Sequence, residues 1–186
     1  WHKSWHKCRG ERMIRTRLLH TWIIRALVIL SCGVGLPIRS LADPLAFIAP
    51  SDALILLDGD TLIHDRVRYR LAGIDAPETR QICQTSTGQT WSCGVLATSK
   101  LRERMGNHTV RCEGQEADRY NRVIVTCSLE GAQETLNGFM VRSGWAMAYR
   151  RYSQAYVADE DAARHEGRGI WSGPVVAPWD WRRGLR

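Results

Sequence analysis

Residues 58–78 read DGDTLIHDRVRYRLAGIDAPE, and this stretch predicts a β-hairpin whose two ends lie close together. A short apolar run at 54–57 and an Asp-Gly turn signal precede the first strand, which is expected at Thr61–Asp65. The second strand is expected at Arg66–Ile74, where apolar residues alternate with arginines at a period of two. Arg70 is therefore expected on the face opposite the apolar one.

The hairpin brings acidic residues from its two ends toward each other. Asp60 and Asp75 supply the hard oxygen ligands that Ca²⁺ or Mg²⁺ prefers, and Arg70 supplies a planar fork for a phosphate. Glu78 is then a candidate general base that activates a water molecule. Each motif alone also has an ordinary interpretation, because Asp-Gly-Asp-Thr is a common turn and Asp75-x-x-Glu78 suits the start of a helix. The combination of both motifs with an arginine between them favours the catalytic interpretation.

Residues 13–42 have the pattern of a secretory signal peptide. Basic residues follow Met13, residues 26–36 form an apolar run, and small residues precede a cleavage position after Ala42. We interpret residues 1–12 as an over-extended reading frame. The mature protein is therefore expected to be secreted or periplasmic, without stable membrane association. An uncleaved N-terminal anchor is the alternative, although the apolar run is short for a membrane span.

The formal net charge of +7 belongs to the leader. Residues 1–42 contain eight Lys or Arg and one Glu, whereas residues 43–186 contain 18 basic and 18 acidic residues. The mature part is therefore electrically balanced, which excludes a protein that coats nucleic acid with an overall basic surface. Any nucleic acid must be recognised at a local arginine site.

Residues 43–186 are expected to form a single domain, and four cysteines lie in it. Four cysteines allow three pairings. A hairpin that turns between Arg119 and Tyr120 would place Cys112 opposite Cys127, which favours that pair and leaves Cys83 and Cys93 to close a short loop. Two disulfides suit an exported protein.

The remaining elements follow from periodicity and capping residues. An apolar stripe of Val95, Leu96, Leu101 and Met105 predicts a helix at 94–105. Further helices are expected at 135–143 and, capped by Ser153, up to His165. The lead-in at 43–51, the loop at 80–92 and the tail around 178–182 are expected to lack regular structure.

Several motifs in this order resemble the staphylococcal (micrococcal) nuclease family, from about Ala53 to Trp171. They are Asp58-Gly-Asp-Thr61, Tyr69-Arg-Leu71, Ile74-Asp-Ala-Pro-Glu-Thr79 and Asp118-Arg-Tyr-Asn-Arg122. The resemblance implies an α+β protein with a five-stranded OB-fold β-barrel and three α-helices. It also implies a monomeric, Ca²⁺-dependent nuclease that hydrolyses DNA and RNA and leaves 3′-phosphate ends.

The resemblance assigns roles to residues on both sides of a substrate cleft. Asp60 and Asp75 would hold the metal together with the backbone carbonyl of Ala76, and Asp58 would orient these ligands from behind. Glu78 would activate water. In this position Ala76 replaces a threonine, which removes a hydroxyl but keeps the carbonyl ligand.

Further residues correspond to the family's substrate contacts. Arg122 would clamp the same phosphate as Arg70. Arg119, Tyr120 and Tyr149 match positions beside the substrate, where an aromatic ring can stack on a base. The alternative to a nuclease is a catalytically inactive OB-fold module that binds nucleic acid or protein. Such modules usually lose their acidic and arginine residues, whereas this chain keeps them.

Overall fold

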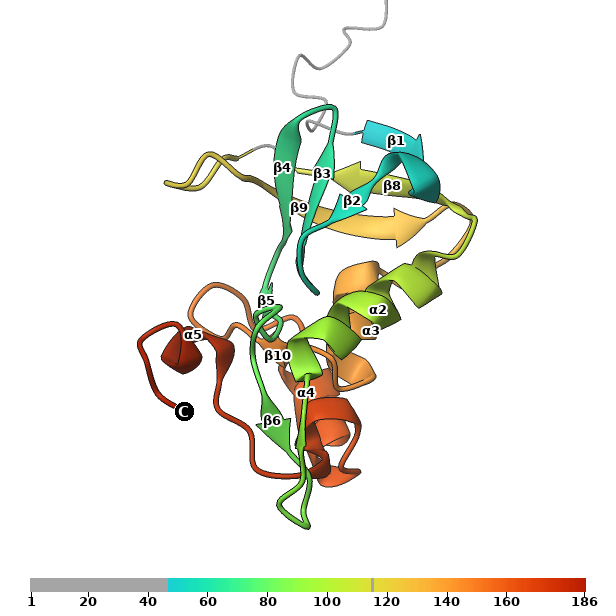
Figure 1. Ribbon diagram of the computed structural model, residues 1–186. Helices are drawn as coiled ribbons and strands as arrows, with labels where there is room; N and C mark the ends of the chain where they lie inside the picture. Colours follow the sequence, from blue (N-terminus) through green and yellow to red (C-terminus); the bar gives the residue numbers. More distant parts are fainter. Residues whose placement is uncertain (1–46, 115) are drawn as a thin grey trace, which may run out of the picture. The chain divides into compact units, whose positions relative to one another are not determined.

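A curled six-stranded sheet forms the upper part of Figure 1, and it begins with β1 (Phe47–Pro50). The strand order is β1-β8-β9-β4-β3-β2. Neighbouring strands run antiparallel except β4 and β9, which are parallel. The other five strands are β2 (Ile55–Leu56), β3 (Thr61–His64), β4 (Val67–Leu71), β8 (Thr109–Glu113) and β9 (Val123–Leu129).

The computed structural model describes residues 47–114 and 116–186, which lie in one compact unit, Ala42–Arg186. The predicted signal peptide and its cleavage position after Ala42 lie outside the described residues. In the part of the chain that the structure describes, no helix has the length and apolar character needed to cross a membrane.

The hairpin predicted from residues 58–78 is confirmed. Strands β3 and β4 pair in the register Thr61↔Arg70 and Leu62↔Tyr69. Leu62 and Tyr69 are buried, whereas Arg70 lies on the opposite face of β4. Residues at the tip, Asp65 and Arg66, both have positive φ values, as a tight hairpin with a right-handed twist requires.

Most of the helices and two short strand pairs lie below the sheet, whereas one 3₁₀ turn lies beside it and connects β1 to β2 (Figure 1). The helices are α2 (Cys93–Met105), α3 (Leu136–Arg142), α4 (Val157–His165), α5 (Pro178–Trp181) and the single 3₁₀ turns η1 (Ser51–Ala53) and η2 (Gly169–Ser172). The short pairs are β5 (Ile74–Asp75) with β10 (Met147–Ala148), and β6 (Cys83–Gln84) with β7 (Thr90–Trp91). The expected α+β architecture with an OB-type curled sheet is confirmed, although the sheet has six strands and not five.

Several expected boundaries were wrong. The lead-in forms β1, because residues 47–50 pair with the otherwise open edge of β8. The tail forms α5, whose Pro178 at the first turn favours a helix start. The loop at 80–92 contains β6 and β7. Ser153 does not cap α4, which begins after Tyr156; its hydroxyl accepts a hydrogen bond from the Ala155 N–H.

The buried face of α2 also differs from the predicted stripe. Leu101 and Met105 are buried as expected, and Ala97 lies beside them one turn earlier. Val95 and Leu96 are exposed, at 53 % and 39 %. Because an α-helix places residues four apart on one face, the face is set by Ala97, Leu101 and Met105.

Two disulfides cross-link segments of the part of the chain that the structure describes. Cys112 lies opposite Cys127 in the β8–β9 pair and is bonded to it, with 4.0 Å between the Cα atoms. Cys83 is bonded to Cys93, with a Cα–Cα distance of 5.6 Å. This is the pairing that the hairpin register favours. The second disulfide joins the β6–β7 segment to the first residue of α2.

Asn137 connects three parts of the fold from the first turn of α3. Its side chain is fully buried, and its Oδ1 accepts a hydrogen bond of 3.0 Å from the Cys127 N–H. Its Nδ2 donates to the carbonyls of Ala72, at 3.0 Å, and Val125, at 3.2 Å. A single amide therefore satisfies backbone groups on β9 and just after β4 that have no water to replace it.

We expect Asn137→Ala to lower the free energy of unfolding by about 3 kcal/mol, because it removes the amide that the Cys127 N–H and the Ala72 carbonyl bind. Urea unfolding followed by circular dichroism measures this loss. Asn107→Ala, at an exposed turn after α2, is the matched control and should change stability by less than about 0.5 kcal/mol. Equal effects of the two substitutions would contradict the connecting role of Asn137.

Candidate active site

Asp60 sits in a bend between β2 and β3 that is tightly packed. A Cβ at Gly59 would lie 2.8 Å from the Ala76 Cβ, so only glycine allows this approach of the two segments. The Asp58 Oδ1 accepts a hydrogen bond of 3.0 Å from the Asp60 N–H. Asp58 therefore orients Asp60 through a hydrogen bond to its backbone, which is the role that the family resemblance implies for Asp58.

Arg70 joins Asp60 to Asp75. One guanidinium nitrogen donates to the Asp60 Oδ1, and the other donates to the Asp75 Oδ1 at 2.7 Å. The side chains of Arg70, Asp60 and Asp75 are only 11 %, 2 % and 0 % exposed. The second oxygen of Asp60 accepts the Ala76 N–H at 2.7 Å. The structure thus brings the two predicted metal ligands together, with the predicted phosphate-binding arginine between them.

Asp75 and Glu78 lie on the segment that leaves the sheet. Asp75 is fixed by the β5–β10 pair, where it lies opposite Met147. Glu78 follows in a stretch without regular structure, and its side chain is about a third exposed. Arg182 from the C-terminal segment contacts both carboxylates: it donates to Asp75 at 2.6 and 3.1 Å and to Glu78 at 2.6 Å.

Burial sets the electrostatics of the two aspartates. Loss of hydration raises the pKa of Asp60 to about 6, although the Arg70 charge opposes the rise. Burial also raises the pKa of Asp75, against hydrogen bonds and charge from Arg182 and Arg70. Burial therefore disfavours the charged forms of Asp60 and Asp75, and a bound cation would stabilise these charges.

The donor set fits a hard divalent cation. Asp60 and Asp75 offer carboxylate oxygens on either side of the Arg70 guanidinium, and Ala76 follows Asp75 directly in the chain with its backbone carbonyl. All four carboxylate oxygens accept hydrogen bonds in this structure, so a cation would replace some of these bonds. Within residues 47–114 and 116–186, no group of three or more His, Cys, Asp or Glu side chains is arranged around one metal position. The protein would therefore supply two carboxylates, and backbone carbonyls and water would complete the ligand shell.

Arg122 is not brought into contact with this cluster. Its guanidinium forms hydrogen bonds of 2.9 and 2.6 Å to the Asp118 carboxylate within the β8–β9 turn. The parallel register places Arg70 opposite Ile124, so Arg122 lies two residues earlier along the neighbouring strand. Its side chain is 23 % exposed, and its Nη1 forms no hydrogen bond with the described residues.

The other predicted substrate contacts lie in two places. Arg119 and Tyr120 are together on the turn, where Arg119 donates to the Tyr120 hydroxyl at 2.7 Å and Tyr120 is 61 % exposed. Tyr149 lies elsewhere, directly after β10. Its backbone N–H donates to the Gly73 carbonyl at 2.8 Å, which fixes it beside the turn between β4 and β5.

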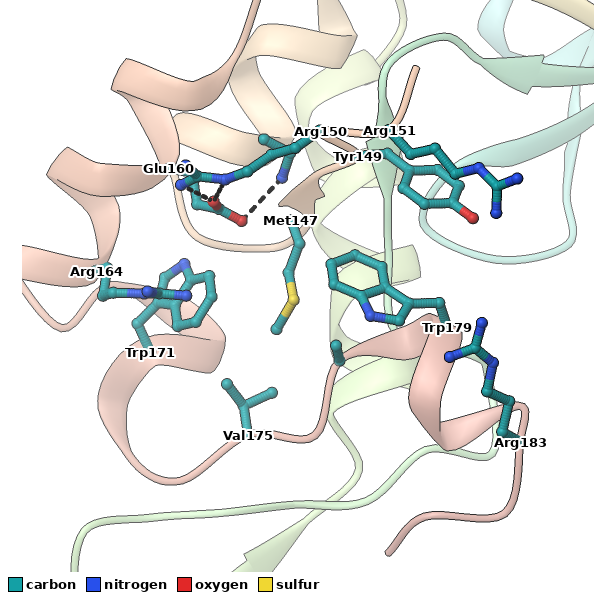
Figure 2. A pocket seen from close by; sticks show the side chains of 12 residues that line it. Met147, Tyr149, Arg150, Arg151, Glu160, Arg164, Trp171, Val175, Trp179 and Arg183 are labelled. Atoms are coloured by element: carbon teal, nitrogen blue, oxygen red, sulfur yellow. Dashed lines mark hydrogen bonds and ion pairs between the residues drawn. The ribbon is translucent and has the colours of Figure 1, made fainter. Parts of the chain in front are cut away.

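Tyr149 borders a cavity of about 430 Å³ that the C-terminal segment helps to form. Figure 2 shows the Trp179 ring next to the Tyr149 ring at one side of this cavity. The two rings are stacked, with centroids 5.4 Å apart and planes 4° apart. The floor is apolar, with Met147 and Val175. Arg150 is tied to Glu160 on the far wall, so that arginine is already neutralised by a carboxylate.

Sequence reasoning missed Arg182 and Trp179. Both belong to the segment Pro178-Trp-Asp-Trp-Arg182, which was expected to lack regular structure. Its dense tryptophans were the available signal, since such rings need a surface to bury against. More than 100 residues separate Arg182 from Asp75 and Glu78, and no periodicity in a sequence reports a contact of that range.

Comparisons with known proteins agree with this geometry. A family model described as staphylococcal nuclease homologue matches residues 68–173. Micrococcal nuclease from Shigella flexneri is 37% identical over 148 residues, which cover 69% of this chain and 77% of that protein. An uncharacterized endonuclease from Escherichia coli is 33% identical over 134 residues, covering 68% and 80%. Protein ParB from Escherichia coli is 30% identical over 175 residues, covering 86% and 93%.

We expect the Asp60 carboxyl to titrate near pH 6 in protein kept free of divalent cations, because it is buried. Carbon-13 NMR of the carboxyl measures this directly. Because the folded protein then binds more protons than the unfolded chain between about pH 4 and 6, the free energy of unfolding should fall as pH rises through that window. Titration of the Asp60 carboxyl should lower the free energy of unfolding by about 3 kcal/mol across this window.

The difference in stability between the wild-type protein and Asp60→Asn isolates the contribution of Asp60. Relative to the variant, the wild type should lose stability between about pH 4 and 6 and stay level above it. A carboxyl that titrates near its ordinary value, together with a flat difference, would contradict a buried, charge-destabilised Asp60.

Proposed function

Because the chain belongs to the staphylococcal nuclease family, we propose that it hydrolyses phosphodiester bonds of DNA and RNA in a Ca²⁺-dependent reaction that leaves 3′-phosphate ends. The observation that carries this proposal is the convergence of Asp60, Arg70 and Asp75, with Glu78 joined to Asp75 through Arg182. Carboxylates for a cation, a guanidinium for a phosphate and an accessible base are the groups that such hydrolysis needs.

The reaction forms one bond and breaks another. Glu78 accepts a proton from water as the water oxygen attacks phosphorus, and the bond from phosphorus to the 5′-oxygen breaks. The 5′-oxygen leaves and takes a proton from solvent water, and the phosphate remains on the 3′-oxygen. Glu78 is suited to the first step because its side chain is accessible, whereas Asp60 and Asp75 are buried.

Arg70 supports the transition state by its position. One nitrogen of its planar guanidinium donates to Asp60 and the other donates to Asp75. A phosphate that arrives beside Arg70 would accept hydrogen bonds from the same two nitrogens. Asp60, Asp75 and the Ala76 carbonyl would hold Ca²⁺, which would supply positive charge that polarises the phosphate. Asp58 keeps Asp60 oriented through the hydrogen bond to its backbone N–H.

The substrate chain would extend from this centre toward the aromatic residues. We assign Arg122 to the far side of the phosphate, which its Nη1 would contact while Nε and Nη2 hold Asp118. Arg119 and Tyr120 on the exposed turn would contact a neighbouring nucleotide. Trp179 covers one face of the Tyr149 ring, so Tyr149 would touch a phosphate through its hydroxyl. None of these contacts reads the 2′-hydroxyl of the sugar, so this arrangement suits both DNA and RNA.

Export fits the chemistry of the chain. Both disulfides lie in the part that follows Ala42, and disulfides persist in secreted or periplasmic proteins. We therefore propose that residues 1–42 direct export and are removed, and that the enzyme acts as a monomer outside the cytoplasm.

Cleavage of single-stranded DNA and of RNA tests this function. The purified protein should cleave both with Ca²⁺ and lose activity with a chelator. Glu78→Gln should lower kcat by about 10²–10⁴-fold, because the amide cannot accept the proton from water. Product ends that carry a 3′-phosphate resist extension until a phosphatase removes it, which identifies the bond that is broken.

Glu130→Gln, an exposed change of the same chemistry between β9 and α3, is the matched control and should leave kcat unaltered. A Glu78→Gln enzyme with the wild-type rate would remove Glu78 from the reaction. Absence of cleavage with every metal, from folded and disulfide-bonded protein, would favour the inactive binding module.

A further inference from the structure

Arg182 extends the central ion-pair cluster by one more step. The charged groups alternate in the order Asp60, Arg70, Asp75, Arg182 and Glu78, and each is hydrogen-bonded to the next. Burial opposes the positive charge of Arg182, but hydrogen bonds to Asp75 and Glu78 outweigh it and raise its pKa above the ordinary value. Arg182 therefore stays charged throughout the pH range of the enzyme.

The segment that carries Arg182 is fixed independently of the ion pairs. Trp179, one turn earlier on α5, stacks on Tyr149. The buried Gln81 donates to the Val176 carbonyl at 2.7 Å, just before α5. Apolar residues of the segment, including Val175 and Ala177, pack against a small core that contains the Cys83–Cys93 disulfide. The guanidinium is therefore presented from a docked surface and not from a free tail.

The Glu78 carboxylate, by contrast, has little support of its own. The Glu78 backbone packs closely against Gly94 of α2 and forms hydrogen bonds of 3.3 and 2.7 Å with Gln81, although residues 76–78 have no regular secondary structure. Among the residues that the structure describes, Arg182 is the one side chain that hydrogen-bonds the Glu78 carboxylate. Without it, the carboxylate has a full set of rotamers available.

The contact leaves one Glu78 oxygen available for chemistry. Arg182 binds Oε1 only, and Oε2 accepts no hydrogen bond from the described residues. Arg182 also takes both oxygens of Asp75 at the same time, so its fork fixes the distance between the base and the metal-ligand segment. A guanidinium can hold two carboxylates in this way because its donors point in fixed directions, which an ammonium group cannot reproduce.

We propose that Arg182 is a positioning residue of the hydrolytic reaction, which holds the Glu78 carboxylate against Asp75 so that the free oxygen faces the attacking water. This inference rests on the function proposed above. It extends the site to the C-terminal segment, with Tyr149 and Trp179 forming the support that keeps Arg182 in place. Loss of a positioning contact should reduce turnover and not substrate binding, because displacement of a reacting group by about 1 Å can cost about 10²-fold in rate.

The test compares Arg182→Gln, Arg182→Lys and the control Arg183→Gln. Arg183 is the neighbouring arginine, but it is 72% exposed and pairs with Asp180 on its own helix. We expect Arg182→Gln to lower kcat by about 10–10²-fold with KM changed less than about 3-fold. Arg182→Lys should fall between this variant and the wild type, and Arg183→Gln should match the wild type. Thermal unfolding identifies any variant that fails to fold.

Hydrogen exchange gives a readout that does not need activity. In Arg182→Gln, amides in the peptide spanning residues 78–81 should exchange faster than in the wild type, whereas Arg183→Gln should leave them unchanged. If the wild type cleaves no nucleic acid, the proposed function fails, and exchange alone still decides whether Arg182 holds this segment. Unchanged exchange, or a folded Arg182→Gln with wild-type or higher kcat, overturns the proposal.

Discussion

The ion pair of Arg70 with Asp60 and Asp75 is the interaction on which the rest of the structure depends. Two carboxylates buried this deeply repel each other and lose hydration, so they can stay together only if a cation lies between them. Arg70 supplies that charge from β4, Asp60 enters from the bend before β3, and Asp75 enters from β5. The fold is therefore organised so that three separate segments meet at one point of opposite charge.

The remaining architecture keeps these segments in register. The parallel β4–β9 pair fixes Arg70 relative to the rest of the sheet. The side chain of Asn137 on α3 forms hydrogen bonds with backbone groups of β9 and of Ala72, just after β4. The β5–β10 pair fixes Asp75, and the docked C-terminal segment reaches the same carboxylate from the other side. The proposed base, Glu78, lies on an irregular stretch, but rigid elements surround it.

Sequence reasoning identified the parts of the site that local pattern encodes. The period-two alternation of β4 placed Arg70 on the face away from Leu62 and Tyr69, and the symmetric hairpin register paired Cys112 with Cys127. It failed where distant segments decide the outcome. Strand β1 forms because β8 offers an open edge. Val95 and Leu96 are exposed because α2 packs through Ala97. Arg182 contacts Glu78 although 104 residues separate the two in the sequence.

The most direct test of this account is a calorimetric titration of Ca²⁺ into the purified protein and into folded Asp60→Asn and Asp75→Asn variants. The account predicts one Ca²⁺ site in the wild type, weakened at least about 10-fold by either substitution, because each removes a charged oxygen ligand. Glu78→Gln should bind Ca²⁺ like the wild type, because the proposed role of Glu78 is to accept a proton from water and not to bind the metal. Unchanged Ca²⁺ affinity in both aspartate variants would contradict the assignment of Asp60 and Asp75 as the metal site.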